Sequence, residues 1–301
     1  MLYYITCLVI IFNAMYVTKR TLHMLQQNLY NENNRYLKWI TKNFKVTILN
    51  YSLLLIVVAL LNLKFDITLI ALISMIIISV VSCFNEKQIK STNQNKKPLV
   101  YTSRIKRLIV TIVILYLLPI VLGIVFKQYK DYYLFVLAIL TGFSFYTTFL
   151  ALLINAPIER CVYKHFESLA KNKLKSMSNL KVIGITGSYG KTSSKNILND
   201  ILSVKFNTLA TPKSLNTFNG LMITVNNKLS KFDEVFIAEM GAYVRGEING
   251  LCDLVNPKYG IITSIGTAHL ATFGSEENIQ KAKMELIEHL PSDGVGVLNR
   301  D

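Results

Sequence analysis

The chain has 301 residues, 51% of them hydrophobic, and 33 Lys and Arg against 18 Asp and Glu give a formal net charge of +15 at pH 7. The apolar residues gather before residue 158, which argues against a purely soluble enzyme. Residues 1–158 also carry 16 of the basic residues and only 4 acids. Basic loops that face anionic lipid explain this charge, so no nucleic-acid partner is expected.

Five apolar stretches without Asp, Glu, Lys or Arg occupy this first region. A membrane-spanning helix needs about 20 apolar residues. We therefore expect residues 1–158 to form a membrane region of about five transmembrane helices. The first stretch is short, but it lacks the basic start and small-residue cleavage site of a signal peptide, so we expect an uncleaved anchor. The stretches are 2–17, 46–63, 67–84, 108–126 and 132–154.

The charges between the stretches predict the membrane topology. Segments 18–45 and 85–107 carry six and seven basic residues, with one acid each. Basic loops face the cytoplasm, so the N-terminus is expected outside and everything after residue 155 inside a bacterial cell membrane. Within segment 20–45 the pattern fits either an interfacial amphipathic helix or a solvated loop.

The four cysteines are Cys7, Cys83, Cys161 and Cys252, and they form no C-x-x-C pair. We expect buried or free thiols in a reducing compartment. Residues 159–180 read as a basic connector with a helix from Arg160 to Lys175.

The run Gly187-Ser188-Tyr189-Gly190-Lys191-Thr192 follows a β-branched stretch and precedes a helical one. Strand, glycine turn and helix form the context of a phosphate-binding loop, here shorter than the common G-x4-G-K-[ST]. Backbone N–H groups and the helix N-terminus attract an anion, and Lys191 adds a full charge. Thr192 is placed to bind a phosphate-bound Mg²⁺. The run predicts that the chain binds a nucleoside triphosphate.

From Lys181 onward, short apolar runs alternate with helical stretches. This alternation predicts an α/β domain with a parallel sheet and ligands at the carboxyl ends of its strands. The expected strands are 181–186, 234–238, 259–264 and 294–298, and the expected helices are 193–204, 217–229, 245–254 and 276–289.

Three polar residues follow these strands. Glu239 is predicted to bind Mg²⁺, and His269 is a ligand candidate, although a lone loop histidine is more often structural. Asn299 is placed to hydrogen-bond a base or ribose. Lys283 lies on the last helix and reads as a surface lysine by spacing alone.

Five motifs in order resemble the central ATPase domain of the Mur ligases, most of all their D-alanyl-D-alanine-adding members. They are the loop above, Asn216-Thr217-x-x-Gly220, Glu239-Met-Gly-Ala, Ala268-His269 with Phe273-Gly274-Ser275, and Lys281-Ala-Lys283-x-Glu285. The resemblance covers roughly residues 178–301, and it implies a partial central ATP-binding domain at 181–301. The membrane half resembles the multi-span extension of some members.

The resemblance implies an ATP-dependent amide-bond-forming ligase of peptidoglycan precursor synthesis. The carboxylate of a UDP-MurNAc-peptide is activated as an acyl phosphate, and D-alanyl-D-alanine attacks it. Other cell-wall synthesis proteins are possible partners.

The resemblance also assigns site residues. It implies that Lys191, His269 and Lys283 are catalytic, that Thr192 and Glu239 bind a first magnesium, and that His269 and a carbamylated Lys283 bind a second. The implied ATP contacts are Gly187, Ser188, Tyr189, Gly190, Lys191, Thr192, Ser193 and Asn299, and the implied substrate contacts are Asn216 and Thr217.

Two departures from the family pattern carry expectations. Membrane helices stand where the family has a UDP-binding domain, which weakens the substrate assignment. The chain ends at Asp301 within the ATPase domain, so we expect residues 1–301 alone to be unable to complete ligation.

Two other functions stay open on the sequence. One is a Mur-like ligase for another polymer such as poly-γ-glutamate. Measuring whether glutamate or D-alanyl-D-alanine is incorporated would distinguish it from the ligase above. The other is a membrane transporter or sensor driven by the phosphate loop. Transport calls for charged groups inside the spans, and these spans carry none.

Overall fold

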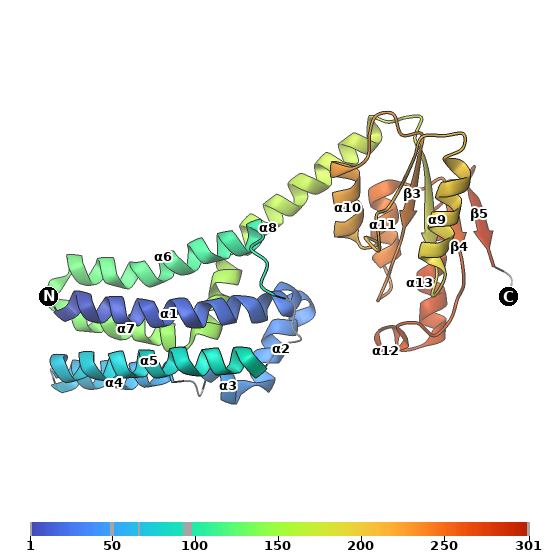
Figure 1. The fold of residues 1–301 in the computed structure, drawn as a ribbon. Coiled ribbons are helices and arrows are strands. Elements are labelled where there is room, and N and C mark those ends of the chain that lie inside the picture. Colours follow the sequence, from blue (N-terminus) through green and yellow to red (C-terminus); the bar gives the residue numbers. More distant parts are fainter. Residues whose placement is uncertain (1, 49–50, 66, 93–97, 300–301) are drawn as a thin grey trace. The chain divides into compact units, whose positions relative to one another are not determined.

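The computed structural model describes residues 2–48, 51–65, 67–92 and 98–299. The chain divides into two compact units, Met1–Glu159 and Arg160–Asp301, here called unit 1 and unit 2 (Figure 1). Among the predicted basic-loop residues, Lys96 and Lys97 lie outside the described residues.

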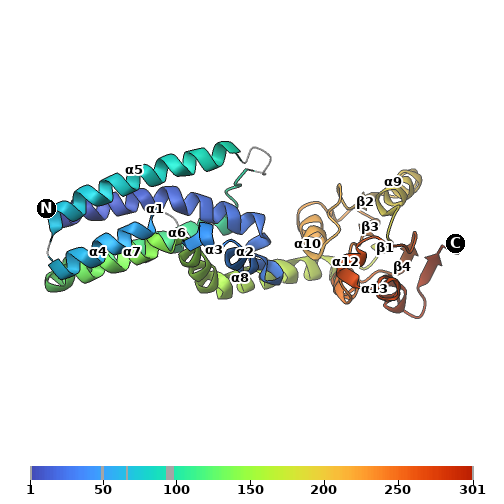
Figure 2. The ribbon, with the colours of Figure 1, turned by 90° about the horizontal axis from the view of Figure 1, so that it is seen from below.

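Unit 1 is a bundle of helices around one apolar core (Figure 2). Helix α1 packs against α5 and α7, α4 against α5 and α7, and α6 against α7. The core holds fully buried side chains such as Ile10, Leu25 and Ile112. The helices are α1 (Leu2–Gln27), η1 (Leu29–Asn34), α2 (Arg35–Lys42), α3 (Phe44–Ile48), α4 (Leu53–Phe65), α5 (Thr68–Thr92), α6 (Ser103–Val125), η2 (Lys127–Tyr129), α7 (Lys130–Gly142) and α8 (Ser144–Lys175), whose residues from Arg160 onward belong to unit 2.

The outer surface of this bundle is apolar as well. Large side chains such as Leu8, Met15 and Ile70 are more than 60% exposed. Within the described residues, two helices are long and apolar enough to cross a membrane, Leu2–Gln27 and Ser103–Val125. The bent pair α7 and α8, with a 91° turn between them, makes a third if it counts as one span.

The five-span arrangement therefore stays a prediction. The expected stretch 132–154 is divided at Phe143, where α7 ends and α8 begins. Stretches 46–63 and 67–84 contribute the shorter apolar helices Leu53–Phe65 and Thr68–Ser82. Hydropathy identifies a continuous apolar run in the sequence, but it does not predict whether the backbone of that run forms one straight helix.

Segment 20–45 forms neither a single amphipathic helix nor a loop. Its first part continues α1, with Leu22 and Leu25 buried, and its last part forms α2, with Tyr36 and Ile40 buried. The alternative of a solvated loop is wrong, because these residues form helices with buried apolar side chains. Helix α2 buries one side and exposes polar residues on the other, so an interfacial amphipathic helix stays a prediction for that part of the segment.

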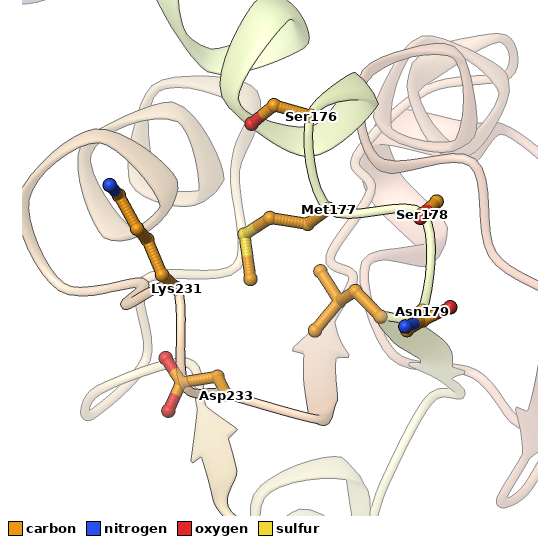
Figure 3. A pocket seen from close by; sticks show the side chains of 7 residues that line it. Ser176, Met177, Ser178, Asn179, Lys231 and Asp233 are labelled. Atoms are coloured by element: carbon orange, nitrogen blue, oxygen red, sulfur yellow. The ribbon is translucent and has the colours of Figure 1, made fainter.

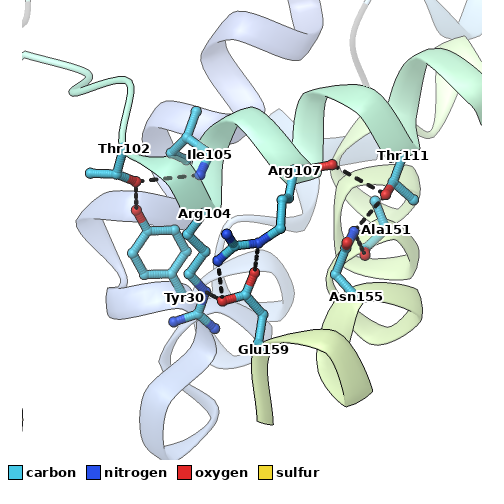
Figure 4. A network of polar contacts seen from close by, with 9 residues as sticks. All are labelled: Tyr30, Thr102, Arg104, Ile105, Arg107, Thr111, Ala151, Asn155 and Glu159. Carbon is cyan, nitrogen blue, oxygen red and sulfur yellow. Dashed lines mark hydrogen bonds and ion pairs between the residues drawn. The ribbon is translucent and has the colours of Figure 1, made fainter. Parts of the chain in front are cut away.

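A polar network ties the start of α6 to the middle of α8 (Figure 4). Arg107 donates two hydrogen bonds to Glu159, at 2.7 Å and 2.9 Å. Arg104 lies 3.7 Å from the same carboxylate and covers the Tyr30 ring. One turn away, Asn155 donates to Thr111 at 2.7 Å. A bidentate arginine–carboxylate pair is geometrically demanding, so it fixes the two helices in register.

Unit 2 is a five-stranded, all-parallel sheet with strand order β2-β3-β1-β4-β5. All four expected strands and four expected helices are present, with ends shifted by one or two residues. The strands are β1 (Lys181–Thr186), β2 (Thr208–Ala210), β3 (Val235–Glu239), β4 (Tyr259–Ile262) and β5 (Val295–Leu298), and the helices are α9 (Lys191–Leu202), α10 (Phe218–Asn227), α11 (Glu247–Val255), α12 (Leu270–Phe273) and α13 (Glu276–Glu288).

Both faces of the central strands are covered, as is usual for parallel sheets, whereas the edge strand β5 is exposed along its length. On one face Val235 and Ile237 pack with Leu198 and Leu202 of α9. On the other face Phe236 and Ala238 pack with side chains of α10, α11 and α13. The alternation along β3 explains why this strand is buried at every position.

Strand β2 and helix α12 were not predicted from the sequence. They have three and four residues, too few for a periodic pattern. β2 exists because its backbone pairs with β3 from Thr208 to Ala210.

The described cysteines are free thiols, as expected, with Cys7 and Cys252 buried and Cys161 exposed. Burial raises the pKa of the Cys252 thiol to about 12, so it behaves as an apolar core side chain. The side chain of Cys83 lies outside the description.

Glu285 generates a stability prediction. This buried α13 carboxylate accepts hydrogen bonds from the Gly246 and Asn249 amides, at 2.7 Å and 3.1 Å, and so closes the N-terminus of α11. Glu285→Ala leaves both amides unpaired and is expected to destabilise unit 2 by about 2 kcal/mol. Hydrogen exchange should speed up at residues 246–250. The exposed Glu288→Ala on the same helix is the control, and equal exchange in both variants would contradict the capping role.

Candidate phosphate-binding site

The loop between β1 and α9 has the backbone of a phosphate-binding turn. Gly187 has φ +149° and Gly190 has φ +80°, values that side chains rarely adopt. A Cβ at Gly187 would also lie 2.1 Å from the Thr263 hydroxyl oxygen. Both glycines are therefore needed for the shape of the loop.

This loop is fastened to the segment that follows β4. The amides of Ser188 and Tyr189 donate to the carbonyl and hydroxyl oxygens of Ser264, at 2.8 Å and 3.1 Å. The Thr263 hydroxyl donates to the Tyr189 carbonyl at 2.6 Å. These two loop amides are thus engaged within the protein, and the loop is held in one conformation.

The amides left for an anion are those of the first turn of α9. Lys191, Thr192 and Ser193 begin the helix, where N–H groups lack intrahelical acceptors. The N-cap is Gly190, which has no side chain to cap them. By contrast, α10 and α13 are capped by the side chains of Thr217 and Ser275. The N-terminus of α9 is therefore an open anion site.

Lys191 stands beside this site, as the sequence predicted. Its ammonium group donates to the carbonyls of Gly187 and Ser188. Partial burial lowers the pKa of Lys191, while the charge of Glu239 opposes that shift. The lysine is held against the loop by weak neutral acceptors, from which it can turn to a phosphate.

Glu239 is the centre of a buried polar cluster at the end of β3. Its carboxylate is 3.1 Å from the Thr192 hydroxyl and accepts a hydrogen bond from the Asn216 amide at 3.0 Å. It also forms an ion pair with Lys195 at 2.9 Å, and both side chains are at most 2% exposed. The structure brings the predicted residues Thr192, Asn216 and Glu239 together.

Lys195 was missed by sequence reasoning. It lies one helical turn beyond Lys191, a spacing that places it on the same side of α9, but nothing in the sequence marks it as buried. Its ammonium group also donates to the Lys213 carbonyl at 2.6 Å. A buried carboxylate needs such a cation, because an unpaired charge in the interior is very costly.

Thr217 and Asn216 both have structural roles in this structure. Thr217 caps α10 by accepting from the Gly220 amide, and the Asn216 carbonyl accepts from Gly241 at 2.7 Å. Their predicted contact with substrate or phosphate stays a prediction, as does the nucleotide contact of Asn299, whose amide donates to Ile262 at 3.3 Å.

His269 and Lys283 lie on the α12–α13 side of the unit. The exposed His269 has φ +64° and meets the Tyr243 ring edge-on, with centroids 4.6 Å apart. Lys283 is 3% exposed, with its ammonium group 5.8 Å from the centre of the Phe273 ring. The expectation of a surface lysine is wrong, because α13 turns this position into the core.

Burial gives Lys283 an unusual acidity. Loss of solvation, reinforced by the positive charge of Lys191, lowers the pKa of Lys283 to about 8, against 10.5 for an ordinary lysine. About a tenth of the amine is therefore neutral at pH 7, far more than in an ordinary lysine, and the neutral amine is the form that reacts with electrophiles.

Within the described residues, no three His, Cys, Asp or Glu side chains are grouped as a metal site. The predicted first pair, Thr192 and Glu239, is in contact. His269 and Lys283 contact the aromatic rings of Tyr243 and Phe273, and the predicted second metal site stays a prediction.

A pocket of ≈ 500 Å³ lies elsewhere, among Met177, Leu180, Lys231, Asp233 and neighbouring residues (Figure 3). Leu180 precedes β1 and Asp233 precedes β3, so this pocket is at the amino-terminal edge of the sheet. Parallel α/β sheets bind ligands at the opposite edge, where Glu239 lies. The pocket is not the candidate site.

Comparison with known proteins matches residues 185–301 to the Mur ligase middle domain. The UDP-N-acetylmuramoyl-tripeptide–D-alanyl-D-alanine ligase of Bacillus subtilis is 38% identical over 129 residues, which cover 43% of this chain and 28% of that protein. The Synechocystis ligase of the same name is 39% identical over 122 residues, 40% of this chain and 27% of its own length. The MurF ligase of Thermotoga maritima, solved in complex with ADP, has a TM-score of 0.44 and 36% identity over 46% of this chain and 32% of its own. The chain thus spans less than a third of each relative.

The Lys195–Glu239 pair leads to a test of the cluster. Lys195→Met leaves a buried carboxylate without its cation and is expected to cost about 3–5 kcal/mol of folding stability. Adding Glu239→Gln removes the unpaired charge and should recover much of the loss, so that the two changes are not additive. Denaturant unfolding monitored in unit 2 measures this, with the exposed Lys281→Met as control. Additive losses would refute the pairing.

Lys283 predicts a pH dependence of stability. Its pKa is about 8 folded and near 10.5 unfolded, so the unfolded state binds more protons between these values and stability rises with pH across that window. Well below pH 8 the amine is protonated in both states, so the full cost of burying the charged ammonium group destabilises the folded state. We expect the free energy of unfolding of the wild type, relative to that of Lys283→Met, to increase between pH 7 and pH 10.5, as denaturant unfolding at several pH values would measure. A constant difference would mean that the amine titrates normally.

Proposed function

We propose that this chain, whose residues 185–301 form a Mur ligase middle domain, belongs to an ATP-dependent ligase that joins D-alanyl-D-alanine to a UDP-MurNAc-tripeptide in peptidoglycan synthesis. The relatives that carry this name support the substrate pair. The observation that carries the proposal is the uncapped N-terminus of α9, with Lys191 beside it and a buried carboxylate behind it.

The phosphates of ATP fit the N-terminus of α9. The amides of Lys191, Thr192 and Ser193 point along the helix axis toward an anion, and the helix dipole adds to their attraction. Lys191 exchanges the loop carbonyls for a phosphate oxygen, an acceptor with which its charge interacts more strongly. Gly187 and Gly190 have no side chains, so the loop backbone can lie close to the phosphates. Hydrogen bonds to Ser264 hold the loop backbone, so apart from the turn of the Lys191 side chain the site can stabilise a transferring phosphoryl group with little reorganisation.

Magnesium fits Thr192 and Glu239. A hydroxyl and a carboxylate are oxygen ligands of the kind this ion prefers, and they already lie 3.1 Å apart. When bound, the ion would neutralise charge on the nucleotide phosphates. Asn216 and Lys195 hold the carboxylate from its other sides, so its position is set before any ligand arrives.

Lys283 and His269 are proposed as the further polar groups of the reaction. The lowered pKa of Lys283 suits addition of carbon dioxide to its neutral amine, which would convert a cation into an anionic ligand. His269 lies on the loop after β4, where parallel sheets carry functional side chains. Asn216 and Thr217 are proposed to approach substrate, and Asn299 the nucleotide.

We also propose that unit 1 is embedded in the bacterial cell membrane, with several spans, an external N-terminus and unit 2 in the cytoplasm. Its apolar outer surface and its two helices of spanning length support this. The basic segments 18–45 and 85–107 would then face the cytoplasm, where ATP is available. Other proteins of cell-wall synthesis are natural partners on the same membrane.

The decisive variant is Lys191→Ala, made in the protein expressed from its own gene. Loss of the ammonium group is expected to lower both nucleotide affinity and D-alanyl-D-alanine joining by about 100-fold or more. Nucleotide binding and ATP-dependent formation of the joined peptide are measured side by side. Ser203→Ala, at the other end of α9, should behave as wild type. Unchanged binding and joining in Lys191→Ala would remove the basis of the proposal.

A further inference from the structure

Two loops of unit 2 meet beside the phosphate loop. The first follows β3 and carries Tyr243, and the second follows β4 and carries His269. Strands β3 and β4 both pair with β1, so these loops leave the sheet on either side of the phosphate loop that follows β1. The rings of Tyr243 and His269 meet edge-on, with centroids 4.6 Å apart and an angle of 64° between their planes. The contact joins the loops on the two sides of the phosphate loop.

The groups around this ring pair border the phosphate site. The ammonium group of Lys283 is close enough to Lys191 and to Glu247 for both charges to affect its pKa. Lys191 begins α9 at the phosphate loop, whereas Glu247 begins α11 and bonds to the loop after β3. Phe273, which contacts Lys283, ends the short helix α12 that His269 caps. The loops of the ring pair are therefore neighbours of the phosphate site.

Tyr243 is held in place through its backbone. The Glu247 carboxylate accepts hydrogen bonds from the amides of Tyr243 and Val244, at 2.6 Å and 3.2 Å. Glu247 lies in the first turn of α11, and Glu285 in turn binds the amides at the start of that helix. The tyrosine ring therefore extends from a backbone whose position is fixed relative to α11.

The fold itself does not require an aromatic side chain at this position. Tyr243 is 50% exposed, and its neighbour Val244 is 46% exposed, so neither side chain fills the core. The hydrogen bonds to Glu247 use backbone amides, which any residue except proline supplies. The feature of Tyr243 that depends on its ring is the contact with His269.

His269 has a fixed backbone and an imidazole without hydrogen bonds. It adopts φ +64° at the start of α12, and its carbonyl accepts from the Thr272 hydroxyl at 2.8 Å and the Phe273 amide at 3.1 Å. Among the described residues, none forms a hydrogen bond with its ring nitrogens. Edge-to-face packing is a favoured arrangement of two rings. The Tyr243 ring therefore orients the imidazole and leaves both nitrogens available to a ligand.

We propose that Tyr243 is a positioning residue that holds the imidazole of His269 toward the ligand of the phosphate site. The inference rests on the proposed role of His269 in the ligase reaction. An unrestrained side chain on an exposed loop changes rotamer rapidly, and a misplacement of about 1 Å can lower an enzymatic rate about 100-fold. A hydrogen bond would restrain the imidazole at the cost of one nitrogen, whereas the ring contact restrains it and occupies neither.

The test follows His269 by NMR in the full chain, held in lipid nanodiscs. The sequence has four histidines, so carbon-13 labelling of histidine gives a simple spectrum, in which His269→Gln assigns one signal. Tyr243→Ala removes the ring and Tyr243→Phe keeps it, while Val244→Ala is the matched control on the same loop. Spectra are recorded with and without a non-hydrolysable ATP analogue and Mg²⁺. Joining of D-alanyl-D-alanine is measured for the same variants in the protein expressed from its own gene.

Positioning predicts that the Tyr243 ring displaces the His269 signal in the wild type, in Tyr243→Phe and in Val244→Ala. In Tyr243→Ala the signal should move to the position of a solvated histidine, and the ATP analogue should no longer shift it. For joining, Tyr243→Ala should lower kcat about 10- to 100-fold with little change in the KM for ATP. The unfolding midpoint of unit 2 should not change, and in a His269→Gln background Tyr243→Ala should cause no further loss of joining.

The inference is overturned if the His269 signal and its response to the ATP analogue are the same in the wild type and in Tyr243→Ala. It is also overturned if His269→Gln joins at the wild-type rate, or if Tyr243→Ala lowers joining equally with and without His269. A wild type that binds the nucleotide but joins no D-alanyl-D-alanine contradicts the proposed reaction instead, and the NMR response then decides the positioning role by itself.

Discussion

A carboxylate buried at the end of a β-strand governs the arrangement of the candidate site. Glu239 is 1% exposed, and its charge must be balanced inside the protein. Lys195 supplies the opposite charge from α9, and Thr192 and Asn216 supply hydrogen-bond donors from α9 and the loop before α10. Two separate segments, α9 and the loop before α10, are therefore held around one group at the end of β3. The phosphate loop begins α9, so the same contacts also fix where the loop lies.

The backbone amides of the loop and of the helix that follows it fall into two groups with different roles. The amides of Ser188 and Tyr189 donate hydrogen bonds to Ser264, and these bonds hold the loop against the segment after β4. The amides at the start of α9 remain available for an anion. Rigidity and binding are thus assigned to different peptide groups, which suits a site that must meet a phosphate without rearranging.

Two lysines near this site differ in what burial does to them. Lys195 is paired with a carboxylate and stays a fixed cation that positions Glu239. Lys283 is buried against an aromatic ring with Lys191 as a neighbouring charge, and its pKa falls to about 8. The first environment keeps a lysine charged and the second favours its neutral form, although both lysines sit on helices flanking the same sheet.

The sequence by itself determined the α/β pattern, the phosphate loop and the place of Glu239, because each depends on residues that are neighbours along the chain. Alternating β-branched and helical runs gave four strands and four helices close to their observed ends. The sequence could not show that Lys195 and Lys283 are buried, since their surroundings come from segments distant in the chain. Strand β2, the capping of α11 by Glu285 and the break at Phe143 also arise only when elements pack together. Local patterns encode elements, and tertiary contacts decide what each side chain meets.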